Sequence, residues 1–281
     1  VYLLSVRTVR KESDMKRITS ARCINCIPEV VPKKRSNNKK LKLLITNKRI
    51  DWGFKQSILM IQSRLQQIMR RTGDKVLLIT STIPAEGKTM TSVNMALAFA
   101  QEGMKVALLD GDLRKPSVSE LMKLPEGPGL TEYFRGESTP EEIQVVKDGV
   151  TFFRAGQKKG KVSGLIDEEK MNSLLEKLRK EYDVILMDAA PSYVFSDAMI
   201  LSSYADKVLY VVRVDKADAK EIRVGMNSFE EKEKLIGYVI NRDTGGYISQ
   251  SGYGYGRYGK YQKYRKYAEL DEETMNTEDT L

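Results

Sequence analysis

The chain has 281 residues, of which 41% are hydrophobic and 30% are charged, and its formal net charge is +9. This length suits one α/β domain with appended segments. The chain has no histidine and only two cysteines, which excludes a structural zinc site with the usual four ligands, and no apolar run approaches the roughly 18 residues of a membrane-spanning helix.

The positive charge is concentrated near the N-terminus. Residues 1–50 hold 14 basic and three acidic side chains, whereas residues 51–244 hold 28 basic and 29 acidic side chains. We therefore predict three parts: a basic arm or linker over 1–50, a folded domain over 51–244 and a tail over 245–281. The most basic stretch of the arm, at 33–42, can bind an anionic membrane or nucleic acid, or it can be a solvated linker, and the sequence leaves these alternatives open.

The two cysteines, Cys23 and Cys26, form a C-x-x-C pair within the arm. A structural zinc site would need a second pair or histidines as well. We expect both to be free thiols, and the alternative is a redox or intermolecular role.

The folded domain begins with an amphipathic helix predicted over residues 51–72. Helical patterns also occur at 90–103 and 168–181. Short runs that are almost entirely apolar are typical of strands buried on both faces, and they lie at residues 75–81, 105–112, 183–189, 207–214 and 237–242. Because strand and helix alternate, we predict an α/β fold with a parallel sheet and helices on both of its faces.

The tail has a different composition from the domain. Residues 245–267 are rich in glycine and tyrosine and poor in aliphatic side chains, which predicts a flexible segment. Its alternating basic and aromatic residues also resemble a platform for single-stranded nucleic acid. However, residues 245–281 hold five basic and six acidic side chains, so we expect nucleic acid to be an unlikely partner.

The segment STIPAEGKTM, residues 81–90, matches a phosphate-binding loop, except that Thr82 replaces the first glycine of the usual G-x-x-x-x-G-K-[ST] pattern. It lies between a predicted strand and a predicted helix, as the pattern requires. Backbone N–H groups at the start of that helix can surround a phosphate, while Lys88 neutralises its oxygens and Thr89 binds Mg²⁺. The loop residues predicted to bind nucleotide are Pro84, Ala85, Glu86, Gly87, Lys88, Thr89 and Met90.

Three acids follow predicted strands, in DGDLRKP at 110–116 and MDAAP at 187–191. Ligands bind at the carboxyl ends of strands in open α/β sheets, so we expect Asp110, Asp112 and Asp188 to converge on the loop. The alternative is that each acid only caps the turn after its strand. Asn241, at the end of the last predicted strand, either contacts a purine base or makes a turn.

The ordered motifs STIPAEGKT, LLDGDLRKP and DVILMDAAP resemble those of the bacterial tyrosine kinases, P-loop autokinases of capsule and exopolysaccharide assembly. The second motif has the family's form D-x-D-L-R-x-P. The family also ends in a tyrosine cluster, and the tyrosines that match it are Tyr247, Tyr253, Tyr255, Tyr258, Tyr261, Tyr264 and Tyr267.

The resemblance implies an ATP- and Mg²⁺-dependent protein-tyrosine kinase with a P-loop NTPase fold, which regulates polysaccharide polymerisation and export. It implies that a neighbouring subunit of a homo-oligomer phosphorylates the tail tyrosines in trans. It also implies a cognate tyrosine phosphatase and a location at the cytoplasmic face of the bacterial membrane. The arm resembles the cytoplasmic segment of the polysaccharide co-polymerase, whose membrane domain is fused or separate.

Within this resemblance we expect Lys88, Asp110 and Asp112 to be catalytic, with Thr89, Asp112 and Asp188 around the metal. Asp110 then accepts or orients the tyrosine proton, although the sequence does not separate its role from that of Asp112. The alternative function is a MinD- or ParA-like ATPase switch without kinase activity. Those ATPases usually carry a second lysine near the start of the loop, and this chain has none there.

The chain departs from the family at two places. The helix before the first strand usually carries E-x-x-R-x-x-R, which builds a ring-shaped oligomer, but Phe54, Ser57 and Met60 occupy those positions here. The ring contact is therefore not predicted by the motif. Ala189 and Ala190 replace the usual Thr-Pro after the third acid, while Asp188 itself is retained.

Overall fold

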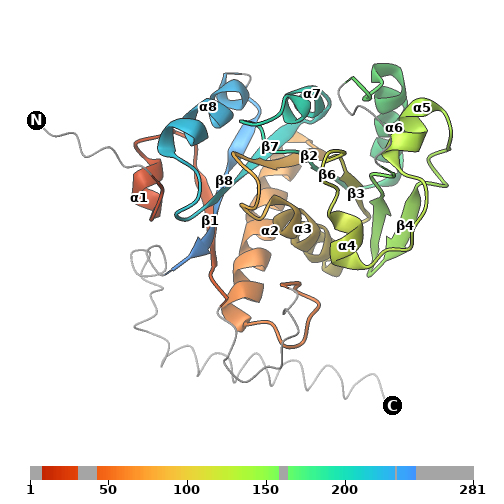
Figure 1. The fold of residues 1–281 in the computed structure, drawn as a ribbon. Coiled ribbons are helices and arrows are strands. Elements are labelled where there is room, and N and C mark those ends of the chain that lie inside the picture. The colour runs from red at the N-terminus through yellow and green to blue at the C-terminus, as the bar shows by residue number, and fades with distance from the viewer. Residues whose placement is uncertain (1–7, 31–42, 158–163, 232, 245–281) are drawn as a thin grey trace, which may run out of the picture.

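The computed structural model describes residues 8–30, 43–157, 164–231 and 233–244 (Figure 1). Within them, the strands are β1 Cys23–Pro28, β2 Val76–Ser81, β3 Val106–Asp110, β4 Gln144–Lys147, β5 Val150–Phe153, β6 Val184–Asp188, β7 Lys207–Arg213 and β8 Leu235–Asp243. The helices are α1 Glu12–Met15, α2 Trp52–Thr72, α3 Lys88–Gln101, α4 Val118–Met122, α5 Leu130–Arg135, α6 Glu168–Glu181, α7 Asp197–Tyr204 and α8 Ala219–Glu230.

The strands form one sheet in the order β1-β8-β7-β2-β6-β3-β5-β4. All neighbouring strands are parallel except β4 and β5, which form an antiparallel pair at one edge. The central strands β2, β6 and β3 end at the same edge of the sheet, where Asp110 pairs in register with Asp188. The predicted P-loop NTPase-type sheet is confirmed, and the five strands predicted from apolar runs correspond to β2, β3, β6, β7 and β8.

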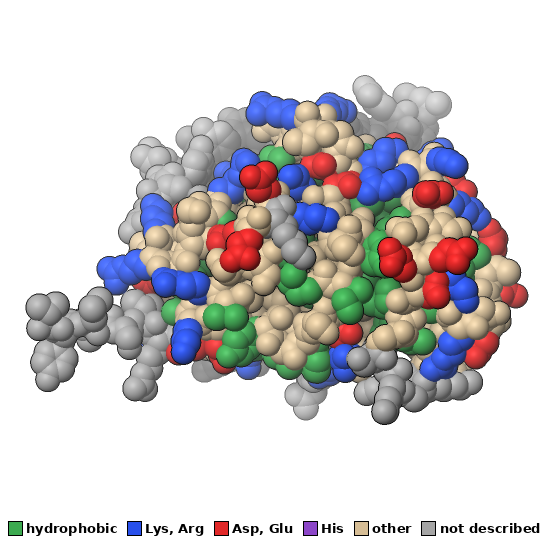
Figure 2. Space-filling view, turned by 90° about the horizontal axis from the view of Figure 1, so that it is seen from above, with side chains coloured by type: hydrophobic (Ala, Val, Ile, Leu, Met, Phe, Trp, Pro, Cys, Tyr) green, Lys and Arg blue, Asp and Glu red, His purple; other side chains and the backbone are tan. Residues whose placement is uncertain are grey.

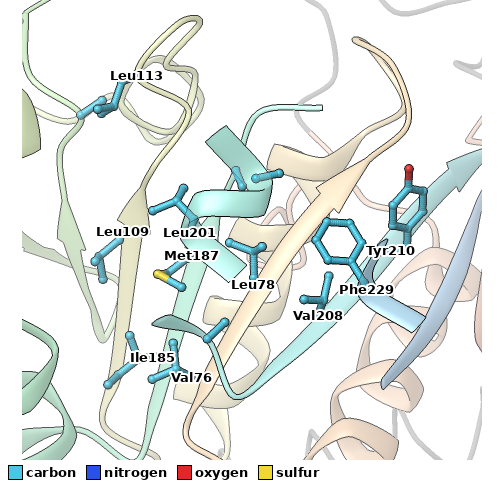
Figure 3. Close-up of a cluster of buried hydrophobic side chains, with 14 of the residues drawn as sticks. Val76, Leu78, Leu109, Leu113, Ile185, Met187, Leu201, Val208, Tyr210 and Phe229 are labelled. Atoms are coloured by element: carbon cyan, nitrogen blue, oxygen red, sulfur yellow. The ribbon is translucent and has the colours of Figure 1, made fainter. Parts of the chain in front are cut away.

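Helices cover both faces of the sheet, as predicted. One hydrophobic cluster lies between the sheet and α5, α6, α7 and α8, and Figure 3 shows part of it, including Val76 and Leu78 of β2, Leu201 of α7 and Phe229 of α8. The alternate residues of β2, Leu77 and Ile79, belong to a second cluster with α2, α3 and α4. Both faces of a central strand are therefore buried, which explains its uninterrupted apolar sequence.

The first long helix, α2, is bounded by local signals in the sequence. The side chain of Asp51 accepts hydrogen bonds from the N–H groups of Gly53 and Phe54, and the helix ends at Gly73, whose φ of 74° is left-handed. At the positions that correspond to the family's E-x-x-R-x-x-R motif, Phe54 and Ser57 are buried, while Met60 is 48% exposed. These three side chains therefore do not form an exposed row on this helix.

Part of the N-terminal arm lies in the sheet. Strand β1 pairs in parallel with β8 along the edge of the sheet, and Ile24, Cys26 and Ile27 are buried. Figure 1 shows this first strand beside the last one. The sequence did not indicate this strand, because a single short strand has no distinguishing pattern of its own. Its position depends on β8, more than 200 residues away.

Both cysteines of β1 are free thiols, as predicted. The neighbouring Cys23 side chain and burial both raise the pKa of the Cys26 thiol. The sulfur of Cys26 therefore stays protonated within the core.

No helix among the described residues is both long and apolar enough to cross a membrane. On the face seen in Figure 2, basic and acidic side chains are interspersed, with small hydrophobic areas between them. The basic stretch at 33–42 and the tail at 245–281 lie outside the described residues, so the predictions made for them remain predictions.

Candidate functional site

The predicted phosphate-binding loop connects the end of β2 to the start of α3. Within it, Ala85 and Gly87 have left-handed φ angles of 69° and 98°. A Cβ atom on Gly87 would lie 2.1 Å from Nδ2 of Asn241, so only glycine fits at this position. No side chain among the described residues caps the start of α3, which leaves the N–H groups of its first turn to bind an anion.

Lys88, the first residue of α3, lies between two of the predicted acids. Its Nζ is 2.7 Å from Oδ2 of Asp112 and 3.4 Å from Oδ2 of Asp188. Burial alone would lower the pKa of Lys88, but the negative charges of Asp188 and Asp112 outweigh it and raise the pKa. Lys88 is therefore a buried ammonium group at the mouth of the loop.

Asp188 is the most completely hydrogen-bonded acid of the site. Its carboxylate accepts hydrogen bonds from the hydroxyls of Thr89, at 2.6 Å, and Ser92, at 3.0 Å. Ser92 was not predicted, because a serine in a helix carries no signal until the facing strand is known. The contact brings β6 and α3 together directly beneath the loop.

Asp110 and Asp112 each lie near the phosphate-binding loop and also cap the turn after β3, the two alternatives that the sequence left open. Oδ2 of Asp110 accepts a hydrogen bond from the N–H of Val118, and Oδ1 of Asp112 accepts one from the N–H of Lys115, so both acids stabilise the turn after β3. Oδ1 of Asp110 is buried without a hydrogen-bond partner in the described structure. Burial and the neighbouring Asp188 carboxylate raise the pKa of Asp110. The three acids do converge, as predicted.

Arg114 connects this turn to the segment that follows β6. Its guanidinium forms hydrogen bonds with both oxygens of Asp197 and lies 4.5 Å above the ring centroid of Phe195. Asp197 is buried at the start of α7. The sequence did not identify Asp197, since its partner lies 83 residues away.

Asn241 contacts the backbone of the phosphate-binding loop, which is neither of the two roles predicted for it. Its Nδ2 donates to the backbone oxygen of Glu86 at 2.7 Å, and its Oδ1 accepts from the N–H of Arg242. In this arrangement its amide holds the phosphate-binding loop, and direct contact with nucleotide remains a prediction.

The site has the features that a magnesium nucleotide needs. Phosphate oxygens can bind the free N–H groups of α3 and the Lys88 ammonium, and the unpartnered Oδ1 of Asp110 leaves one buried acceptor for a proton or ligand. The described residues contain no cluster of three or more acidic or cysteine side chains arranged to hold a metal alone. Mg²⁺ takes several of its ligands from phosphate and water and is usually bound through one or two carboxylates.

Comparison with known proteins gives a consistent result. The family model ParA, described as a NUBPL iron-transfer P-loop NTPase, matches residues 73–219. Tyrosine-protein kinase CpsD of Streptococcus pneumoniae is 34% identical over 184 residues, which cover 61% of this chain and 78% of that protein.

Other relatives are longer or have known structures. Tyrosine-protein kinase ptk of Acinetobacter johnsonii is 27% identical over 198 residues, which cover 68% of this chain and 27% of that protein, so this chain spans about a quarter of its length. The solved kinase domain of the Escherichia coli tyrosine kinase ETK superposes with a TM-score of 0.71 at 26% identity, covering 79% of this chain and 90% of that domain.

Proposed function

The chain belongs to the bacterial tyrosine kinases, a family of P-loop NTPases, and from this premise we propose that it is an ATP-dependent kinase that phosphorylates its own C-terminal tyrosines. The observation that carries the proposal is the position of Lys88. Its ammonium group lies between Asp112 and Asp188 at the start of a helix that no side chain of the described structure caps. A phosphate group bound there would meet positive charge from two directions.

The residues of the loop would bind and orient the phosphates. The N–H groups at the start of α3 hold the phosphate chain, and Lys88 moves from its carboxylate partners onto the β- and γ-oxygens. Bound Mg²⁺ would neutralise charge on these oxygens, with Thr89, Asp112 and Asp188 as its protein-side residues. Orientation and charge neutralisation by these groups would supply most of the catalysis, because phosphoryl transfer needs them more than covalent help.

Asp110 is the residue we assign to the tyrosine proton. Its buried Oδ1 has no partner in the described structure, and burial together with the charge of Asp188 raises its pKa, which favours proton uptake. Asp112, in contrast, is already bound to Lys88 and to the N–H of Lys115. This difference supports a division of roles that the sequence left open.

The acceptors are the seven tyrosines of the tail, Tyr247, Tyr253, Tyr255, Tyr258, Tyr261, Tyr264 and Tyr267. We infer that a neighbouring copy phosphorylates them, so the active form is a homo-oligomer. Full modification adds about −10 to −14 charges, so modified tails would repel one another and separate the subunits.

We infer the partners of the whole protein from the family to which the chain belongs. We propose that the chain acts with the membrane domain of a polysaccharide co-polymerase, fused or separate, at the cytoplasmic face of the membrane, and that a tyrosine phosphatase reverses the modification. In this arrangement the phosphorylation state of the tail regulates capsular or extracellular polysaccharide assembly. The relatives are named tyrosine-protein kinases, which supports the phosphorylation step of this proposal.

Autophosphorylation tests the proposal directly. Wild type, Lys88→Met and the control Lys147→Met are incubated with Mg-ATP, and phosphate on each tyrosine is measured by mass spectrometry and an antiphosphotyrosine probe. Lys147 lies on the edge strand β4, where its Nζ donates to the backbone oxygen of Met122. We expect tail phosphorylation in wild type and the control, and its loss in Lys88→Met. ATP hydrolysis without phosphotyrosine in wild type would instead indicate an ATPase switch.

A further inference from the structure

One buried carboxylate in the phosphate-binding loop has no place in the mechanism above. The side chain of Glu86 is completely buried, although Pro84 and Ala85 just before it are exposed. Its Oε2 accepts a hydrogen bond from the N–H of Ile83 at 2.8 Å, and its Oε1 accepts one from the N–H of Arg213 at 3.2 Å. The carboxylate therefore joins the start of the loop to the last residue of β7.

The same part of the loop is held at two further points. The guanidinium of Arg213 donates to the backbone oxygen of Ala85 at 3.0 Å, and Nδ2 of Asn241 donates to the backbone oxygen of Glu86 at 2.7 Å. Strands β7 and β8 thus hold two consecutive loop residues from outside the loop. None of these contacts involves the N–H groups at the start of α3, which remain available for phosphate.

The composition of this loop explains why it needs such support. Thr82 occupies the position of the first glycine, and Ala85 adopts a left-handed φ of 69° that residues with a side chain rarely occupy. Backbone in this region persists only when its surroundings determine it. The Glu86 carboxylate bonds to Ile83, which lies between these two residues, and to Arg213 of β7, so its contacts can hold this part of the loop in its conformation.

We propose that Glu86 is a positioning residue that fixes the phosphate-binding loop against the end of β7, so that nucleotide binding depends on a buried carboxylate that does not itself touch the nucleotide. The inference rests on the proposed nucleotide site but not on tyrosine phosphorylation. Burial raises the pKa of Glu86 to about 7, against the hydrogen bonds from Ile83 and Arg213 that lower it. The titratable groups that face it are Arg213 and the buried phenol of Tyr210.

The substitution Glu86→Gln isolates this role. Glutamine has nearly the same shape, but it presents one oxygen and one NH₂ group where the loop supplies two N–H donors. One backbone donor therefore loses its acceptor and faces another donor. Because the altered contacts are buried, this one replacement should disturb the loop without leaving a cavity.

The chain offers a matched control in Glu132. This glutamate is also buried, and its carboxylate also accepts from two backbone N–H groups, those of Gly129 at 2.8 Å and Gln157 at 3.2 Å. It lies in α5, far along the chain from the phosphate-binding loop. Glu132→Gln therefore makes the same chemical change in another buried carboxylate that accepts hydrogen bonds from two backbone N–H groups.

Two measurements on the full chain test the inference. The dissociation constant of a fluorescent ATP analogue is measured with Mg²⁺ and expressed per titrated site, so that a misfolded fraction does not enter it. The rate of autophosphorylation is measured against ATP concentration. For Glu86→Gln we expect the dissociation constant and the KM for ATP to rise about ten-fold, with the maximal rate within about two-fold of wild type, because one hydrogen bond of this kind corresponds to about a ten-fold change.

Each other outcome has a defined meaning. Unchanged binding by Glu86→Gln, or an equal loss in Glu132→Gln, would overturn the inference. Faster hydrogen exchange of residues 82–88 in nucleotide-free Glu86→Gln, but not in Glu132→Gln, supports it, and unchanged exchange opposes it. A wild type that binds nucleotide and phosphorylates no tyrosine would overturn the proposed kinase and leave this inference supported or overturned by the binding data alone.

Discussion

Two regions of this protein bury charged side chains, and these side chains find their hydrogen-bond partners in different ways. Around α5, Arg154 donates to the backbone oxygens of Pro125, Pro128 and Glu142, and Glu132 accepts from two backbone N–H groups. At the carboxyl edge of the sheet, one lysine faces several acids, and Oδ1 of Asp110 has no partner in the described structure.

The difference separates structural charge from functional charge. Around α5 the backbone itself satisfies each charged group, so the charges hold loops in place. At the sheet edge, Asp110 and Asp112 each accept one backbone hydrogen bond. Lys88 and Asp188, in contrast, depend on side-chain partners, an arrangement that a ligand can reorganise. Charge that is incompletely satisfied by the fold is a better indicator of a site than burial alone.

The largest effect should come from Asp188→Asn, which changes the most hydrogen-bonded acid of the sheet edge. We expect the rate of autophosphorylation to fall on the order of 100- to 1000-fold, as for the loss of one preorganised electrostatic group. Burial raises the pKa of Asp188, and asparagine carries no charge to bury, so thermal unfolding should occur at the same temperature or higher. Measured rates and melting temperatures that fall together would show that Asp188 is structural.

In the region around α5 we expect the opposite result, a loss of stability without a loss of phosphorylation rate. Arg154→Met leaves three backbone oxygens without their donor, which should lower the free energy of unfolding by about 3 kcal/mol. Urea denaturation measures this loss. The phosphorylation rate per folded molecule should be unchanged, and a rate loss as large as that of Asp188→Asn would contradict the distinction between the two regions.

Glu86 allows a test based on pH. Its folded-state pKa of about 7 lies above the ordinary glutamate value, so its contribution to stability is present below about pH 4.5 and is lost as the pH rises through about 7. Between pH 5 and 8, wild type should lose about 2 kcal/mol more stability than Glu86→Gln, measured by urea denaturation at both pH values. Parallel pH dependence of the two proteins would show that Glu86 does not titrate in this range.

The smallest effect should come from Arg114→Lys. Arg114 shares features of the structural charges around α5 and of the functional charges at the sheet edge. Lysine keeps the charge but loses the two-point contact with Asp197 and the stacking on Phe195. We expect an approximately five-fold slower phosphorylation rate, equivalent to about 1 kcal/mol. Initial rates at saturating Mg-ATP measure it, and an unchanged rate would place Arg114 with the structural charges.

Features that depend on residues close along the chain could be predicted from the amino-acid order alone. Apolar runs identified the five strands β2, β3, β6, β7 and β8, the amphipathic pattern over 51–72 identified α2, and the loop from Ser81 to Met90 indicated the phosphate site. The ordered acidic motifs indicated which strand ends carry Asp110, Asp112 and Asp188. Each of these signals is contained within a few consecutive residues.

Contacts between distant segments could not be predicted and are known from the fold. It placed β1 beside β8, set Lys88 between two acids, and turned the Glu86 carboxylate toward the end of β7. These partners are 24 to more than 200 residues apart, and their meeting depends on the order in which the strands pair. A residue type states which bonds a side chain can make, but strand order decides which partner is within reach.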